Sequence, residues 1–173
     1  MPTATPKSSA ISFDLFYGGK SVSEAFEEGA QKTEQTTYAV SDETPQFRGI
    51  SIRDVNCKGA FQGIFLQGLP EMNLENISLE NIRMEAEYGL ISKDANNLKI
   101  KNLTLITRKM PVLDLKNCRN FSLDGLTVSP DASPYLTISG SKTENIRLKN
   151  SGITEAVKQL SVGKEVPVNA VHY

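Results

Sequence analysis

Cysteine and histidine, which can act as nucleophiles or metal ligands, are scarce in this 173-residue chain. Cys57 and Cys118 are its two cysteines, and neither belongs to a C-x-x-C pair or to a Cys/His cluster. The single histidine, His172, is the penultimate residue and has no ligand spacing around it, so we expect no metal site and no cofactor. The two cysteines fall at different points of the repeat described below, which predicts two unbridged thiols that are buried or half-buried.

Carboxylates are the other groups that could carry catalysis, because general acid–base chemistry needs an acid and a base that face the same substrate. Asp42 and Glu43 are adjacent in a polar segment, and Glu85 and Glu87 lie in a strand-like segment with no basic partner assigned by register. Asp114 lies between two leucines and is expected to face outward. No repeat column places a second carboxylate opposite any of them. We therefore interpret all five as solvated surface acids and assign no catalytic residue.

A six-residue pattern of alternating apolar residues occurs five times in the sequence. The structure that it forms must position these side chains. It begins at Phe47, Leu74, Ile100, Leu123 and Leu148, with steps of 27, 26, 23 and 25 residues. A period of this size is typical of stacked repeats, in which each unit buries its apolar side against its neighbours. The sequence therefore predicts a solenoid.

The polar positions of the pattern predict columns on the surface of that solenoid. The second position alternates in charge through Arg48, Glu75, Lys101, Asp124 and Lys149. The third position is Asn or Gly in every copy: Gly49, Asn76, Asn102, Gly125 and Asn150. These residues tolerate left-handed backbone, so we interpret the third position as a corner with stacked amides. The fifth position, which begins with Ser51 and Ser78, is expected to face outward.

A second short apolar run follows in each unit, at residues 64–66, 90–91, 112–115, 135–138 and 157–162. A turn residue such as Gly68, Asp94, Asn117 or Gly140 closes it. Short strands separated by corners, without an amphipathic helix, predict an all-β fold. The predicted fold is a single-stranded right-handed parallel β-helix of about four to five coils. The alternative is a leucine-rich repeat, which has a similar period but returns through a helix and places its Asn after the core.

Composition and charge narrow the classes of partner. With 39% hydrophobic residues and a mean hydropathy of −0.29, the chain can form one core. Its 19 basic and 20 acidic residues give a net charge of −1, which argues for neither nucleic acid nor an anionic membrane. No apolar run approaches the ~20 residues of a membrane helix, and residues 1–9 lack the pattern of a signal peptide. The sequence leaves the localisation open.

Residues 1–46 differ from the repeats that follow. The segment from Ile11 to Tyr17 alternates like a strand, and Ser21 to Glu24 is a capping box that predicts a short helix to Glu28. Residues 30–44 are polar and predict a surface loop. The predicted division is thus an irregular N-terminal coil with a loop and short helix over 1–46, and a β-helix with a C-terminal cap over 47–173.

Three segments resemble the C-terminal coils of polygalacturonase-like glycoside hydrolases of family 28, which are right-handed β-helices that degrade pectin. They are Thr44-Pro-Gln-Phe-Arg-Gly-Ile-Ser-Ile, Gly63-Ile-Phe-Leu-Gln-Gly-Leu-Pro-Glu71 and Leu74-Glu-Asn-Ile-Ser-Leu-Glu-Asn-Ile82. A fourth, Ile11-Ser-Phe-Asp-Leu-Phe-Tyr-Gly-Gly19, is similar to the coil that follows the active site in bacterial members. The resemblance spans nearly the whole chain but only the last part of the family's domain. It implies a pectic oligosaccharide as ligand, Tyr17 at the edge of the substrate cleft, and a family that is secreted or periplasmic.

The family's catalytic groups are missing from this sequence. They come from an Asn-Thr-Asp motif and an Asp-Asp pair, supported by Gly-His-Gly and Arg-Ile-Lys, and none of the four occurs here. Lys99-Ile100-Lys101 echoes the last motif, but Ile100 belongs to the predicted core and Lys101 to the charge column. We therefore expect an inactive, noncatalytic C-terminal portion of a pectin-directed hydrolase. The alternatives are a stand-alone β-helix that binds carbohydrate or serves in assembly and, more remotely, a leucine-rich-repeat interaction protein.

Both ends of the predicted stack need cover, because an open coil exposes strand edges and an apolar interior. At the C-terminal end, residues 154–173 are expected to act as a cap. At the N-terminal end, we expect self-association through the first coil as a two-fold dimer, docking of a separate catalytic half, or cover by residues 21–28. Between the ends, eight side chains are expected to stack inward: Ile50, Ile52, Ile77, Leu79, Leu103, Leu105, Leu126 and Val128.

Overall fold

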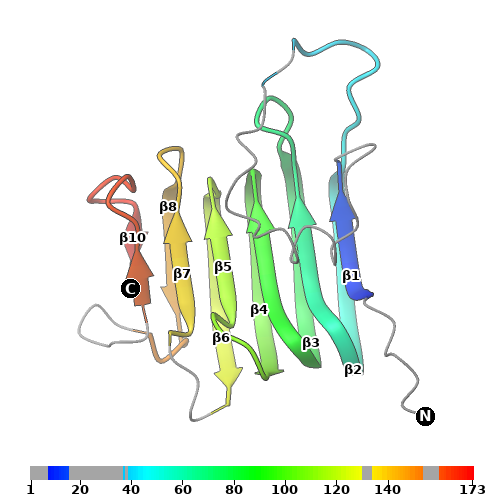
Figure 1. Cartoon of the computed structure of the whole chain (residues 1–173), viewed down its shortest axis with the longest axis vertical. Helices are drawn as coiled ribbons and strands as arrows, with labels where there is room; N and C mark the ends of the chain where they lie inside the picture. The colour runs from blue at the N-terminus through cyan, green and yellow to red at the C-terminus, as the bar shows by residue number, and fades with distance from the viewer. Residues whose placement is uncertain (1–7, 16–36, 38, 130–133, 154–159) are drawn as a thin grey trace.

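The computed structural model describes residues 8–15, 37, 39–129, 134–153 and 160–173. All regular structure in these residues is β, and every strand pairing is parallel. The strands are β1 (Ser9–Asp14), β2 (Arg48–Gln67), β3 (Leu74–Lys93), β4 (Ala95–Thr107), β5 (Leu113–Lys116), β6 (Arg119–Val128), β7 (Leu136–Ser139), β8 (Glu144–Lys149), β9 (Leu160–Val162) and β10 (Val171–His172). They lie side by side in Figure 1. The protein is a parallel β-helix of about five turns, as the repeat predicts.

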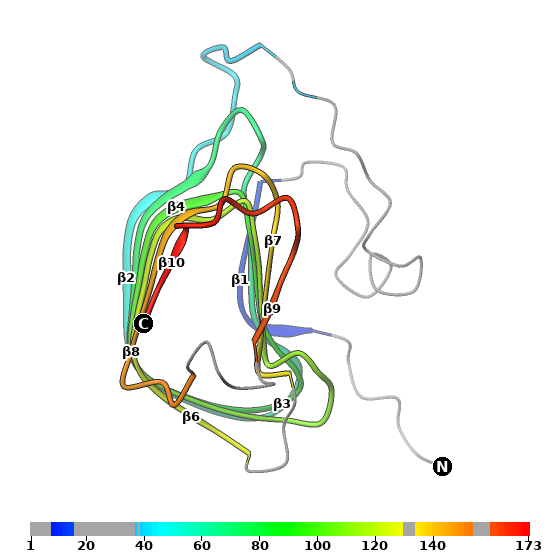
Figure 2. The ribbon, with the colours of Figure 1, turned by 90° about the vertical axis from the view of Figure 1, so that its left-hand side faces the viewer.

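Two stacks of strands form the walls of the β-helix. We call the larger stack the long wall; it runs in the order β2, β3, β4, β6, β8 and β10. The short wall consists of β1, the ends of β2 and β3, and then β5, β7 and β9. Seen at 90° to the first view, strands of successive turns overlie one another around a common interior (Figure 2). The described residues contain no helix, so a leucine-rich repeat, which returns through a helix, does not fit.

Asparagine and aspartate residues turn the corners of each coil. Ten described non-glycine residues have a positive φ, between 48° and 57°, and all of them are Asn or Asp. These two residue types tolerate the left-handed region because their short polar side chains bond locally. The predicted corner is confirmed, since Asn76, Asn102 and Asn150 have positive φ and so do Gly49 and Gly125.

The apolar columns form one continuous core between the walls. Ile77, Leu79, Leu103 and Leu105 are at most 2% exposed, as expected for inward positions. The other four predicted inward residues, Ile50, Ile52, Leu126 and Val128, are partly buried and pack against that core. The second apolar runs predicted from the sequence form the short wall. In these runs one apolar residue of each coil lies opposite that of the next coil: Ile64, Leu90, Leu113, Leu136 and Leu160.

The register between β3 and β4 differs from the expected one by five residues. Leu74 lies opposite Ala95, 21 residues later, and Ile100 lies opposite Leu79. The cause is that the pattern occurs twice in succession, as Leu74-Glu-Asn-Ile-Ser and Leu79-Glu-Asn-Ile-Arg. A shift of five residues exchanges one copy for the other while every apolar residue stays inward. The apolar pattern alone therefore could not choose between the two registers.

In the observed register, the charge column begins with other residues than those predicted from the sequence. It runs through Arg53, Glu80, Lys101, Asp124 and Lys149, and its signs alternate throughout. Glu80 lies 3.5 Å from Arg53 on one side and 3.5 Å from Lys101 on the other. Arg48 and Glu75 belong to a neighbouring column. The principle of the prediction was right, but it merged two adjacent columns.

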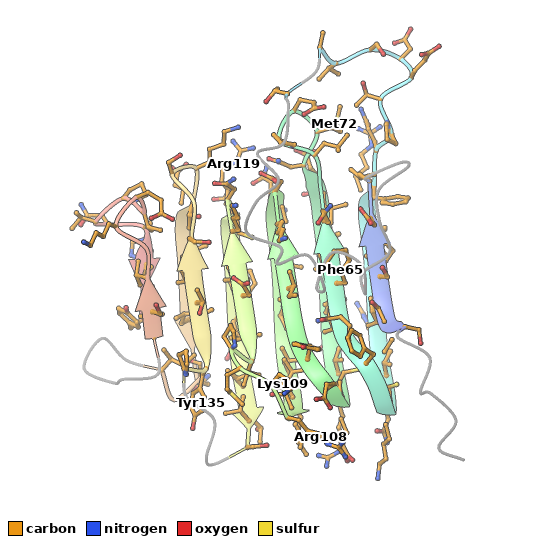
Figure 3. All side chains as sticks on the ribbon, in the orientation of Figure 1. Phe65, Met72, Arg108, Lys109, Arg119 and Tyr135 are labelled. Carbon is orange, nitrogen blue, oxygen red and sulfur yellow. The ribbon has the colours of Figure 1, made fainter. Side chains whose placement is uncertain are left out.

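The segments outside the repeats add strands and loops at both ends. The strand expected near Ile11 is present as β1, which pairs with the end of β2. The helix expected over residues 21–28 lies outside the described residues. After β2, Leu69 and Met72 exchange backbone hydrogen bonds in a loop, and Arg119 donates to the side chain of Asn73 at 2.6 Å (Figure 3). Near the C-terminus, Val166 and Ala170 are buried against the core.

Both cysteines are unbridged, as expected from their positions. Cys57 is half-buried and Cys118 is buried, with its Sγ 3.3 Å from the carbonyl oxygen of Ser92. Burial raises the pKa of the Cys118 thiol to about 12. Cys118 therefore acts as a small core residue rather than as a nucleophile.

Candidate functional site

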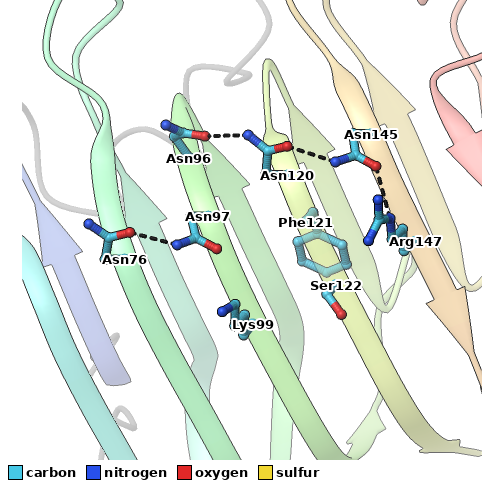
Figure 4. Close-up of a pocket in the computed structure, with 9 residues that line it drawn as sticks. All are labelled: Asn76, Asn96, Asn97, Lys99, Asn120, Phe121, Ser122, Asn145 and Arg147. Atoms are coloured by element: carbon cyan, nitrogen blue, oxygen red, sulfur yellow. Dashed lines mark hydrogen bonds between the residues drawn. The ribbon is translucent and has the colours of Figure 1, made fainter.

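A groove of about 500 Å³ lies on the long wall, across β3, β4, β6 and β8 (Figure 4). Four parallel strands position its lining, so residues far apart in the sequence become neighbours at each strand step. None of the lining residues is acidic. They are Asn76, Asn96, Asn97, Lys99, Asn120, Phe121, Ser122, Asn145 and Arg147.

A ladder of asparagine side chains forms one side of the groove. Asn145 donates from its amide to Asn120 at 2.7 Å, and Asn120 donates to Asn96 at 3.0 Å. On the next strand step, Asn97 donates to Asn76 at 2.6 Å. The ladder changes residue on β4, where two asparagines are adjacent. As a result, Nδ2 of Asn96 and Oδ1 of Asn97 make no hydrogen bond to any described residue and can meet a ligand.

A column of hydroxyl and cationic side chains forms the other side of the groove. Ser78, Lys99, Ser122 and Arg147 lie opposite one another on consecutive strands, and the last three line the groove. Lys99 and Arg147 are two strand steps apart, about 9.6 Å along the stack. Arg147 donates from Nε to Oδ1 of Asn145 at 3.0 Å, which orients its guanidinium beside the ladder.

The two cations of the groove have no acidic partner in the described part of the chain. Ion pairs there occupy the neighbouring columns, as with Glu80 between Arg53 and Lys101, but none includes Lys99 or Arg147. A groove that combines unpaired cations with amides and hydroxyls suits a ligand with carboxylates and hydroxyl groups. The described residues of its lining include no carboxylate, the group that supplies acid and base in glycoside hydrolysis.

A second polar group lies on the outer face of the short wall. Asp114 lies opposite Ile91, and Lys116 lies opposite Lys93. Burial raises the pKa of the Asp114 carboxyl, although Lys93 and Lys116 lower it. Burial also lowers the pKa of the Lys93 ammonium, although Asp114 raises it. Asp114 is thus half-buried beside two cations and not the solvated acid that the sequence suggested.

The other carboxylates considered in the sequence have surface roles. Asp42 and Glu43 are exposed, as expected. Glu85 lies 3.7 Å from Lys58 and 3.6 Å from Arg83, and Glu87 lies 3.8 Å from Arg108. The expectation that these two glutamates lack basic partners was therefore wrong. Lys58 is the register neighbour of Glu85 at the same 27-residue step that the sequence predicts from Phe47 to Leu74.

Tyr17 and His172 are two further residues that the sequence singled out for their chemistry. Tyr17, expected at the edge of a substrate cleft, lies outside the described residues. His172 lies in β10 opposite Arg147, beyond the groove lining. Over the described ranges, no group of three or more His, Cys, Asp or Glu side chains is placed to hold a metal ion. Nor does any described helix have the length and hydrophobicity needed to span a membrane.

Lys99 shows what sequence reasoning missed. In Lys99-Ile100-Lys101, the expected roles of the last two residues are confirmed, because Ile100 is 2% exposed and Lys101 pairs with Glu80. Lys99 was left without a role, yet it lines the groove. A signal was available, because Lys99, Ser122 and Arg147 each directly precede the first apolar residue of a pattern copy. The predicted steps of 23 and 25 residues already place Lys99 in the column of Arg147, and the structure has the same register there.

Comparisons of this chain with family models, with curated proteins and with solved structures found no match.

Proposed function

We propose that the chain is a noncatalytic β-helix portion of a pectin-directed, polygalacturonase-like glycoside hydrolase, and that it holds a polygalacturonate chain in the groove. The resemblance of four sequence segments to such hydrolases supports the protein class. The ligand class rests on Lys99 and Arg147, two cations that have no acidic partner among the described residues and lie beside an amide ladder. A galacturonate chain offers carboxylates to the cations and hydroxyl groups to the amides and serines.

The shape of the groove favours an extended ligand over a compact one. It crosses four strands, so its length follows the axis of the stack. Its two cations are about 9.6 Å apart, two strand steps, and thus suit a ligand whose negative charges recur along its length. A stand-alone carbohydrate-binding module would use the same groove.

Binding of oligogalacturonates of defined length to the purified chain tests the proposal, with calorimetry as the readout. We expect binding that weakens with salt and is absent for the same oligosaccharides after reduction of their carboxylates to alcohols. The double variant Lys99→Ala/Arg147→Ala should weaken binding at least tenfold.

The matched control is Lys101→Ala/Lys149→Ala, which removes two cations from the same strands, two residues farther along each one. This control should retain binding within about twofold. If the two double variants lose affinity equally, the interaction is unspecific electrostatics and the proposed site is wrong. If the chain binds no acidic oligosaccharide, the proposed function is wrong.

A further inference from the structure

The first coil of the long wall has an edge without a neighbouring strand in the described part of the chain. Residues 48–60 of β2 pair with β3 on one side, whereas β1 covers only residues 62–67 on the other. No other described strand lies against residues 48–60, and we call this stretch the free edge.

The apolar interior is also incompletely covered at this edge. Phe47 is 38% exposed, although its ring contacts that of Phe13 at 5.8 Å between centroids. Inward residues of the first coil are only partly buried: Ile50, Ile52, Val55 and Cys57. Their register neighbours on β3 are at most 2% exposed: Ile77, Leu79, Ile82 and Met84. The first coil helps to bury these β3 residues. One more coil, added at the free edge, would bury the inward residues of the first coil in the same way.

At the outward positions that pair in register with β3, every charged residue of the free edge is a cation. These cations are Arg48, Arg53 and Lys58, and each lies opposite a glutamate of β3: Glu75, Glu80 and Glu85. Two of these pairs are ion pairs, at 3.5 Å for Arg53 with Glu80 and 3.7 Å for Lys58 with Glu85. Continued alternation would require three carboxylates in any coil added at this edge.

We propose that residues 48–60 form a docking edge for a β-strand coil of another protein. That partner adds a parallel strand, with carboxylates opposite Arg48, Arg53 and Lys58 and apolar side chains above Ile50 and Ile52. Strand addition supplies backbone hydrogen bonds, and the three charge pairs select register and partner.

A second copy of this chain is the poorer partner. Two copies of the edge would bring the same three cations together, with Asp54 as the single carboxylate on each side. A head-to-tail copy would instead present its last coil, which carries Glu144 in the column of Arg48 but Lys149 in the column of Arg53. Like charges therefore oppose the first arrangement, and the second supplies a carboxylate for Arg48 but a like charge for Arg53.

A labelled synthetic peptide with the sequence of residues 74–87 is the probe, because this segment already carries Glu75, Glu80 and Glu85 in the required spacing. Fluorescence anisotropy measures its binding to the full chain. We expect binding to weaken at least tenfold for the variant Arg48→Glu/Arg53→Glu/Lys58→Glu. A peptide with lysine at the three glutamate positions should bind that variant and not the natural chain.

Two further measurements keep the result interpretable. The neutral variant Arg48→Gln/Arg53→Gln/Lys58→Gln, checked for folding by circular dichroism, should bind both peptides with intermediate affinity. When the acidic peptide binds, amide hydrogen exchange should show new protection in residues 48–60 and unchanged protection in β3. Equal binding of both peptides to both chains, or no binding at all, would overturn the proposal. A dimer of the natural chain in sedimentation, displaced by the acidic peptide, would assign the edge to a second copy instead.

Discussion

The side-chain amide of Asn102 donates a hydrogen bond to Oδ1 of Asn81, 3.0 Å away on the preceding coil. Both residues have left-handed backbone, with φ of 54° and 55°. One residue type thus satisfies two requirements at once, since it tolerates this backbone and links adjacent coils.

Substitution at Asn102 separates these two roles. Asn102→Ala loses the hydrogen bond and strains the backbone, and we expect it to lower the free energy of unfolding by about 1–2 kcal/mol. Asn102→Gly loses only the hydrogen bond and should cost less. Urea denaturation of both variants checks the order, and a glycine variant as unstable as the alanine variant would contradict the role of the backbone.

Leu103 lies in the middle of the core and is 1% exposed. Leu103→Asp buries an unpaired carboxylate, which costs several kcal/mol and should leave the chain unfolded or aggregated. Leu103→Ala should remain folded but lose about 2–5 kcal/mol. The control Thr127→Asp places the same carboxylate on an exposed outward position and should unfold near the natural midpoint. Soluble, cooperative unfolding of Leu103→Asp would refute the inward assignment.

Cys118 should resist thiol reagents in the folded protein. Burial and a pKa of about 12 leave almost no thiolate at pH 8. In a Cys57→Ser variant, which retains Cys118 alone, we expect no reaction with a chromogenic disulfide until denaturant is added. Rapid labelling of this variant under native conditions, with the circular dichroism spectrum unchanged, would show that Cys118 is accessible.

Asp114 should make stability depend on pH. Because burial raises its pKa in the folded state, the native protein binds more protons than the unfolded chain between the two pKa values. The free energy of unfolding therefore falls as pH rises through this interval, which begins near the ordinary value of 3.8. Asp114→Asn should make the fall smaller, with Asp94, whose pKa burial also raises, supplying the rest. The variant should unfold at higher urea concentration than the natural chain at pH 7, with little difference at pH 3. Asp42→Asn, which removes an exposed carboxylate, is the control.

The purified chain should not hydrolyse polygalacturonate. The four catalytic motifs of the enzymes it resembles are missing from its sequence, and the groove lining has no carboxylate. Reducing-end assays with long incubation check this expectation. Turnover that persists through stringent purification and disappears on replacement of one acidic residue of this chain would prove it wrong.

The sequence predicted the coil well because its signals are local. Apolar alternation, Asn at corners and the short second run each follow from a few consecutive residues, and the stacking of Leu90, Leu113 and Leu136 follows from them. The groove was not predictable in the same way. Lys99 and Arg147 share a column in the predicted register as well, but the contact between Asn76 and Asn97 needs the 21-residue register of β3 and β4, which the apolar pattern could not choose.

The five-residue spacing of the two pattern copies has a consequence for how the chain folds. In an ordinary sheet, a slip by one residue moves every apolar side chain to the wrong face and is rejected at once. A five-residue slip between β3 and β4 would keep the apolar residues inside and would even place Glu75 beside Lys101. Such a state is compact and nearly satisfied, so it can persist as a kinetic trap. Correct closure then depends on the 21-residue length of that coil. Insertions or deletions of five residues near Asp94, within that coil, are therefore the changes that would redirect folding without exposing the core.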